Sequence, residues 1–249
     1  MKRIRIIPAL LLINDGLYKT IHFKNPRYVG DPINTVKIFN EKGADEVVVL
    51  DITATRDRKP INYRKIAEIA SEAFMPMSYG GGIKTFDDAQ KVFNAGYEKV
   101  ILNSAAAENP ALIGEIARVY GSQSVVISID GKKDWLGKYK VYTLNGTRSI
   151  GKSPEVYARE MESAGAGEIV VNSIDRDGTW EGYDLQLVKM VSNAVSLPVI
   201  ACGGASGMDD FRKAVTEGGA SAVAAGSLFV YQKKGMGVLI SFPAESLKV

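Results

Sequence analysis

The sequence repeats itself at a constant offset of 122 residues. The segment Gly43-Ala44-Asp45-Glu46-Val47-Val48-Val49 falls on Gly165-Ala166-Gly167-Glu168-Ile169-Val170-Val171 at that offset, and Gly81-Gly82 falls on Gly203-Gly204. The matches continue through Gly96 and Gly218, so they extend over more than fifty residues. Chance rarely keeps one offset over that length. We therefore predict two half-barrels, duplicated and fused.

Short β-branched runs alternate with amphipathic stretches along the whole chain. Eight strand–helix units of about 31 residues each favour a (β/α)8 TIM barrel over the alternative, a doubly wound open sheet. We expect one domain spanning 1–249, with half-repeats at about 1–123 and 124–249. The expected strands are Arg5–Leu11, Val47–Asp51, Met77–Tyr79, Val100–Leu102, Val125–Asp130, Ile169–Asn172, Val199–Ala201 and Ala222–Ala225.

Local signals predict where the helices and one hairpin begin and end. Asp31, Asn109 and Ser153 precede prolines and are expected as N-caps. Gly43, Gly96, Gly165 and Gly218 follow the helical stretches, as left-handed C-terminal residues do. The segment Lys138–Gly151 is expected to form a hairpin after the fifth strand, with Asn145-Gly146 as a two-residue turn.

Composition narrows the class of protein. Among 249 residues, 46% are hydrophobic, which is enough for a large core, and the net charge of +3 is too small to indicate a nucleic-acid or membrane partner. One cysteine and one histidine exclude a disulfide framework and make zinc binding unlikely. We expect no metal and no cofactor. The first residues do not resemble a signal peptide, so we expect a cytoplasmic protein.

Glycines and small polar residues follow four of the expected strands. Gly81 and Gly82 follow the third strand, and Gly203 and Gly204 follow the seventh. The fourth and eighth strands are followed by Asn103-Ser104 and Gly226-Ser227. Such loops let backbone N–H groups approach an anion, so the pair predicts a ligand with a phosphate at each end. The alternative is that these glycines only make tight turns.

Acidic residues lie where strands end. Asp51 and Asp130 close the second and fifth strands, and Asp175 and Asp177 follow the sixth. The carboxyl ends of barrel strands carry catalytic residues, so we interpret Asp51 and Asp130 as acid–base candidates. The alternative is loop capping, which we favour for Asp175.

Four charged residues flank the opposite, amino-terminal ends of the strands: Arg5, Glu46, Lys99 and Glu168. If they point to the axis, they form an alternating ring of two cations and two anions. A buried ring is costly unless it is fully paired. Spacing alone favours a stabilising plug.

The chain resembles the cyclase subunit of imidazole glycerol phosphate synthase over nearly its whole length. The resemblance rests on Arg5-Ile6-Ile7-Pro8, Gly30-Asp31-Pro32, Leu50-Asp51-Ile52-Thr53-Ala54, Gly80-Gly81-Gly82-Ile83, Asn109-Pro110 and Ser173-Ile174-Asp175-Arg176-Asp177-Gly178-Thr179. It implies a half-repeat barrel that binds a doubly phosphorylated ribonucleotide and docks a glutaminase subunit on its N-terminal face.

In that family, ammonia enters through the barrel floor and reacts at the top. The resemblance therefore makes the ring an ammonia gate and overturns the plug interpretation. It also implies that Lys19 lies in a long mobile loop after the first strand and lines the substrate pocket. Asp51, Asp177, Gly178 and Thr179 are the other pocket residues it implies.

One position departs from the family. The family's catalytic aspartate at the end of strand one is Leu11 here, while its partner is kept as Asp130. Leucine cannot relay a proton, so part of the cyclase chemistry is expected to be missing. A paralogous branch that works with a glutaminase and a sugar amidotransferase in surface-polysaccharide pathways resembles this chain.

Three functions stay open at this point. The first is a barrel that delivers ammonia for acetamidino-sugar formation. The second is an authentic cyclase of histidine biosynthesis. The third is a non-catalytic scaffold for the glutaminase and a sugar enzyme.

Overall fold

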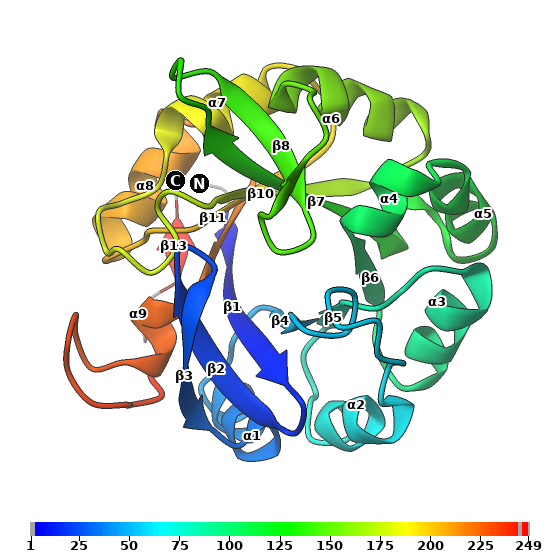
Figure 1. The fold of residues 1–249 in the computed structure, drawn as a ribbon. Helices are drawn as coiled ribbons and strands as arrows, with labels where there is room; N and C mark the ends of the chain where they lie inside the picture. Colours follow the sequence, from blue (N-terminus) through cyan, green and yellow to red (C-terminus); the bar gives the residue numbers. More distant parts are fainter. Residues whose placement is uncertain (1–2, 244–245, 249) are drawn as a thin grey trace.

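Eight parallel strands close into a barrel around a common axis (Figure 1). The computed structural model describes residues 3–243 and 246–248. Strands pair in chain order, and the last pairs with the first, with Ile6 opposite Val223, so no barrel edge stays open. The predicted (β/α)8 barrel is confirmed. Its strands are β1 (Arg3–Ile13), β4 (Val47–Asp51), β5 (Met77–Gly80), β6 (Lys99–Leu102), β7 (Val125–Lys133), β10 (Glu168–Ser173), β11 (Val199–Cys202) and β12 (Ala222–Ala225).

Helices cover the outside of the barrel and connect its strands (Figure 1). The helices are α1 (Pro32–Glu41), α2 (Tyr63–Ala70), α3 (Phe86–Asn94), α4 (Ser104–Glu108), α5 (Ala111–Tyr120), α6 (Pro154–Ser163), α7 (Leu185–Ser192), α8 (Met208–Thr216) and α9 (Ser227–Val230), with a 3₁₀ turn at Ser122–Ser124. The bounds of α6, α7 and α8 lie 122 positions after those of α1, α2 and α3. The sequence offset is thus also an offset between elements of equal length.

Helix ends follow the local signals in part. The Asp31 side chain accepts from the Asn34 N–H and begins α1 as predicted. The prediction for Asn109 is wrong, because this residue ends α4 and α5 begins two residues later. The prediction for Gly218 is also wrong: Gly219 takes the left-handed conformation, at φ +73°. α8 ends at Thr216 with Glu217 as its C-cap, so the left-handed residue lies one position later than it does after α3.

Two antiparallel extensions rise from the carboxyl ends of barrel strands. The segment expected as a long loop after strand one is a hairpin of β2 (Gly16–Ile21) and β3 (Lys24–Gly30) continuing from β1. The predicted hairpin after strand five exists as β8 (Tyr139–Thr143) and β9 (Arg148–Ser149). Its turn is longer than predicted, because Thr143 pairs with Arg148 and four residues connect them. The short β13 (Leu247–Lys248) pairs with the start of β1.

The barrel interior has three layers because strand side chains alternate inward and outward. The floor contains the four ring residues. Above it lies a separate apolar cluster, in which Ala222 and Ala224 are the small members. Its other buried members are Ile7, Val48, Ile101, Val126, Val170 and Ile200. A second, larger core packs the outward faces of the strands against the helices. The third layer is the pocket at the carboxyl ends. No helix in the described part of the chain is long and apolar enough to cross a membrane.

Candidate functional site

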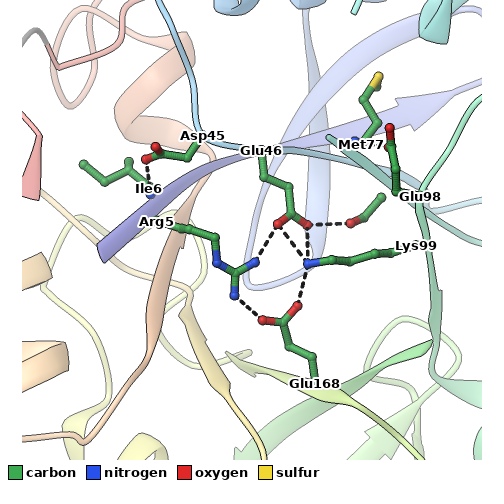
Figure 2. Close-up of polar contacts among 9 residues, drawn as sticks. Arg5, Ile6, Asp45, Glu46, Met77, Glu98, Lys99 and Glu168 are labelled. Atoms are coloured by element: carbon green, nitrogen blue, oxygen red, sulfur yellow. Dashed lines mark hydrogen bonds and ion pairs between the residues drawn. The ribbon is translucent and has the colours of Figure 1, made fainter. Parts of the chain in front are cut away.

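The four charged residues at the barrel floor form a closed ring of ion pairs (Figure 2). Arg5 donates to Glu46 Oε2 at 2.6 Å and also to Glu168. Lys99 Nζ lies 3.0 Å from Glu46 Oε2 and 2.8 Å from Glu168 Oε2. Each cation therefore contacts both carboxylates. The predicted alternating ring is the arrangement observed.

Adjacent residues fix the strands that present the ring (Figure 2). The Ile6 N–H donates to Asp45 at 2.9 Å, and the Met77 N–H donates to Glu98 at 2.7 Å. Ser78 adds a hydroxyl to the ring, donating to Glu46 Oε1 at 2.6 Å. Glu46 therefore has three polar partners, so its buried charge is well compensated.

The ring is anionic at its centre and cationic toward solvent. The side chains of Glu46 and Glu168 are 3% and 6% exposed, whereas that of Arg5 is 34% exposed. Burial lowers the pKa of Arg5, but the hydrogen bond and charge of Glu168, together with those of Glu46, raise it above the ordinary value. Arg5 therefore stays charged in the folded protein.

A cavity of about 150 Å³ opens at the carboxyl ends of the strands. Residues from all eight barrel strands or the loops that follow them line it. Among the sequence-predicted residues, the lining includes Leu11, Lys19, Asp51, Gly81, Gly82, Asn103, Ser104, Asp130, Asp177, Gly178, Gly203, Gly204, Gly226 and Ser227. Thr179 is not among the lining residues, because its hydroxyl turns back to the Arg176 carbonyl at 2.9 Å.

Four glycines shape two opposite walls of this cavity. Gly81 and Gly82 have φ of +107° and +78°, and Gly203 and Gly204 have φ of +90° and +105°. A Cβ on Gly81 would lie 2.2 Å from the Asp51 carbonyl oxygen. The loop path therefore requires glycine whether or not a phosphate binds. What favours an anion site is that both loops face the same cavity at the predicted offset.

Asp130 is buried at the centre of the pocket. Ser128 donates to Oδ1 at 3.1 Å, and the amide of Asn103 donates to Oδ2 at 3.2 Å. Burial raises the pKa of Asp130 to about 7; the Ser128 hydrogen bond lowers it, and the charge of Asp177 raises it. Such a carboxyl group exchanges a proton near neutral pH, which is the property a general acid or base needs. The phosphate contact expected for Asn103 stays a prediction, and its amide nitrogen also helps to hold Asp130.

Leu11 faces the same cavity, and no carboxylate takes its place. Asp15, the other acid near this position in the sequence, is exposed and outside the lining. Within the described residues, Asp51, Asp130 and Asp177 are the lining carboxylates. One oxygen of Asp51 accepts from the N–H groups of Thr53 and Ala54, so the residue acts partly as the loop cap that the sequence left open.

Asp177 joins the β2–β3 hairpin to the loop after β10. Lys19 Nζ lies 2.6 Å from Asp177 Oδ1, and both residues are buried. Thr20 Oγ1 donates to Oδ2 at 2.8 Å, and the Phe23 N–H donates to the same oxygen at 3.2 Å. The Asp177 carbonyl accepts from the His22 N–H at 2.9 Å. These contacts hold the hairpin over one side of the cavity.

Sequence reasoning missed several pocket residues. Asn145, in the turn of the β8–β9 hairpin, donates to the Ile52 carbonyl and so covers the mouth from the other side. Ser128 precedes Asp130 by two positions, so strand alternation could have identified it as an inward-facing partner. Cys202 also lines the cavity, and burial raises the pKa of its thiol to about 12. Asp175 accepts from the Lys133 N–H at 3.0 Å and joins its loop to β7.

Comparison with known proteins identifies the family. A family model described as histidine biosynthesis protein matches residues 5–235. A Pseudomonas aeruginosa protein, provisionally named imidazole glycerol phosphate synthase subunit hisF2, is 52% identical over 98% of this chain and 97% of its own length. A Leptospira borgpetersenii protein, provisionally named imidazole glycerol phosphate synthase subunit HisF, is 49% identical over 98% of this chain and 96% of its own length.

A third relative carries the name without reservation. The imidazole glycerol phosphate synthase subunit HisF of Alkaliphilus metalliredigens is 42% identical over 92% of this chain and 91% of its own. The matched region includes the ring, both glycine loops and Asp130. The chain therefore belongs to the histidine biosynthesis protein family, among the HisF-type imidazole glycerol phosphate synthase subunits.

Proposed function

We propose that this chain is the barrel subunit of a glutamine-dependent enzyme that receives ammonia at its floor and delivers it to the upper pocket without the cyclase reaction of its relatives. The proposal rests on two features that occur together in this chain. The floor ring is complete and closed, while the pocket pairs Asp130 with Leu11 rather than with a second acid.

The interior supports passage of a neutral molecule. Between ring and pocket the strands present only the apolar cluster of the second layer. An ammonium ion would lose its hydration there without gaining a partner, whereas neutral ammonia would lose much less. The ring has two cations and two anions, so its net charge is zero. Breaking one of its ion pairs would open a path for ammonia into the barrel. A glutaminase bound at this face would release ammonia by hydrolysing glutamine.

The pocket supports a phosphorylated ligand and a single proton-exchanging group. Both glycine loops face it at opposite walls, which suits a ligand with a phosphate at each end. Asp130 supplies one acid or base with a pKa of about 7. A reaction that needs two such groups would lose about 10²–10⁴-fold in rate without the second.

The nitrogen acceptor that we propose is an N-acetyl sugar, converted to an acetamidino sugar by a separate sugar amidotransferase in surface-polysaccharide synthesis. Relatives with provisional names are 45–52% identical to this chain, whereas the Alkaliphilus subunit is 42% identical. This difference favours a paralogous role, in the cytoplasm where glutamine-dependent synthesis takes place.

The test is to purify the chain with its glutaminase and follow two reactions. We expect the barrel to stimulate glutamine hydrolysis and to turn over the cyclase substrate negligibly. Leu11→Asp should raise cyclase turnover, whereas Leu11→Asn, of similar size but without a base, should not. Wild-type turnover near that of an ordinary cyclase, or rescue of a strain lacking its cyclase subunit, would instead establish the histidine-pathway function.

A scaffold role makes a different prediction. If the chain only holds two enzymes together, Lys99→Ala should leave amidation of the sugar from glutamine unchanged. If ammonia passes through the ring, the Lys99→Ala variant should release more of the labelled amide nitrogen of glutamine as free ammonium than the wild type does, and transfer less of it to the sugar. The ratio of the two labelled products separates the cases.

A further inference from the structure

A cleft with four cationic side chains lies outside the barrel mouth, behind the first glycine loop. Arg58 and Lys59 come from the loop between β4 and α2. Lys84 lies just before α3, and Lys91 lies in the last turn of α3. Ile61 and Tyr63 form an apolar wall between them. The cleft has a volume of about 350 Å³, and it is more open than the upper pocket. We name it the cationic cleft.

Its positive charge is only partly compensated. Lys91 pairs with Asp87 at 2.6 Å, and Lys59 lies 3.7 Å from Asp57. Among the residues that the structure describes, no carboxylate lies within 4.0 Å of the Arg58 guanidinium or of Lys84 Nζ. Two full cationic groups therefore face a concave surface without a protein partner.

The carboxylate that lines the cleft, Asp88, is already occupied. Its Oδ1 accepts from the Tyr63 hydroxyl at 2.8 Å. Its Oδ2 accepts from the N–H groups of Lys84 and Thr85, both at 3.0 Å, and from the Thr85 hydroxyl. Asp88 thus caps α3 and anchors Tyr63, and its oxygens bond neutral donors rather than a lysine ammonium; its charge offsets one of the four cations.

We propose that the cationic cleft is a second ligand site, distinct from the upper pocket, and that it binds a small molecule carrying two linked phosphate groups. Two of its cationic side chains come from the loop after β4, and two come from the segment that includes α3. That arrangement suits a diphosphate, whose two ends each need a cationic partner. The proposal does not depend on the ammonia-delivering function, because none of these residues belongs to the floor ring or contacts Asp130.

The competing explanation is that these cations only attract phosphate toward the upper pocket. Gly82 lines both the cleft and the pocket, so the two spaces are separated by one residue of backbone. Charges this close would act on an anion in either space, since unscreened attraction reaches about 8 Å at physiological salt. Two isoleucines separate the explanations: Ile61 lines the cleft, and Ile101 lines the pocket.

The experiment is a titration of the whole chain with inorganic pyrophosphate, followed by the NMR signals of ¹³C-labelled isoleucine methyl groups. We expect a saturable shift of the Ile61 signal that sodium chloride at equal ionic strength does not produce. The double variant Arg58→Ala/Lys84→Ala should weaken the affinity measured at Ile61 by about tenfold or more. Lys24→Ala/Lys233→Ala removes two exposed cations elsewhere and should leave the affinity unchanged.

Three outcomes would overturn the proposal. In the first, Ile61 does not move. In the second, it moves equally in wild type and in the Arg58→Ala/Lys84→Ala variant. In the third, only the Ile101 response weakens in that variant, which means that the cations steer ligands to the upper pocket. An unchanged Ile101 signal before titration shows that each variant keeps its fold.

Discussion

Removing Lys99 from the floor ring should destabilise the protein by a definite amount. Lys99→Met keeps the length of the side chain and removes its charge. The variant loses contacts of 2.8 Å to Glu168 and of 3.0 and 3.2 Å to Glu46. Breaking a buried ion pair completely costs about 3–5 kcal/mol. Here Arg5 still pairs with both carboxylates, and Ser78 with one, so we expect a loss of about 2 kcal/mol in the free energy of unfolding.

The loss of Lys99 should leave the charge of Glu168 less well compensated than that of Glu46. Glu46 keeps Arg5 and Ser78, whereas Glu168 keeps Arg5 alone. Adding Glu168→Gln to Lys99→Met should therefore recover part of the loss. A double-mutant cycle should give a coupling of about 1–2 kcal/mol between these two residues.

The assay is thermal and urea unfolding of wild type, both single variants and the double variant. A loss of 2 kcal/mol lowers Tm by about 4–8 °C in a protein of this size. Lys213→Met is the matched control: this lysine is exposed and has no carboxylate partner in the described part of the chain, so it should change stability by less than about 0.5 kcal/mol. If Lys99→Met matches this control, the ring is not the paired, buried network described above.

Three further predictions concern the pocket. The raised pKa of Asp130 means that its ionisation opposes folding, so the unfolding free energy should fall by about 3 kcal/mol through this group as pH rises from 4 to 7. Asp130→Asn should abolish that part of the pH dependence measured by urea unfolding. Gly204→Ala should lower stability by about 1–3 kcal/mol and weaken phosphate binding in calorimetry, because its Cβ would lie 2.3 Å from the Gly182 carbonyl oxygen. Lys19→Met should speed hydrogen exchange at the His22 amide, since Asp177 loses the cation that helps to hold the hairpin; unchanged exchange would contradict this role.

Much of the fold could be predicted because its signals are local. Each barrel strand lies within a few residues of the predicted range, because β-branched runs act over a few residues. The errors also have local causes. The β2–β3 hairpin lacks a tight-turn signal at His22-Phe23, where both residues take positive φ without glycine. The turn after β8 likewise places Leu144 and Asn145 at positive φ, so Asn145-Gly146 was only half of it.

For the candidate site too, features set by position along the chain could be predicted, and contacts between distant segments could not. Because Arg5, Glu46, Lys99 and Glu168 flank the amino-terminal ends of strands, the sequence places them at one end of the barrel. One position distinguishes Leu11 from an acid. The sequence could not show that the Asn103 amide donates to Asp130, or that Lys19 pairs with Asp177, which is 158 positions away. It also could not bring the cationic cleft together from two separate loops.

Sequence by itself therefore determined the repeated half-barrels and the end of the barrel at which the four charges lie, since strand order and an offset of 122 are properties of the chain. Only the tertiary structure decided the proton affinity of Asp130 and the closure of the hairpin over the pocket. The physical reason is that a pKa and an ion pair depend on desolvation and distance, and both exist only after remote segments pack against one another.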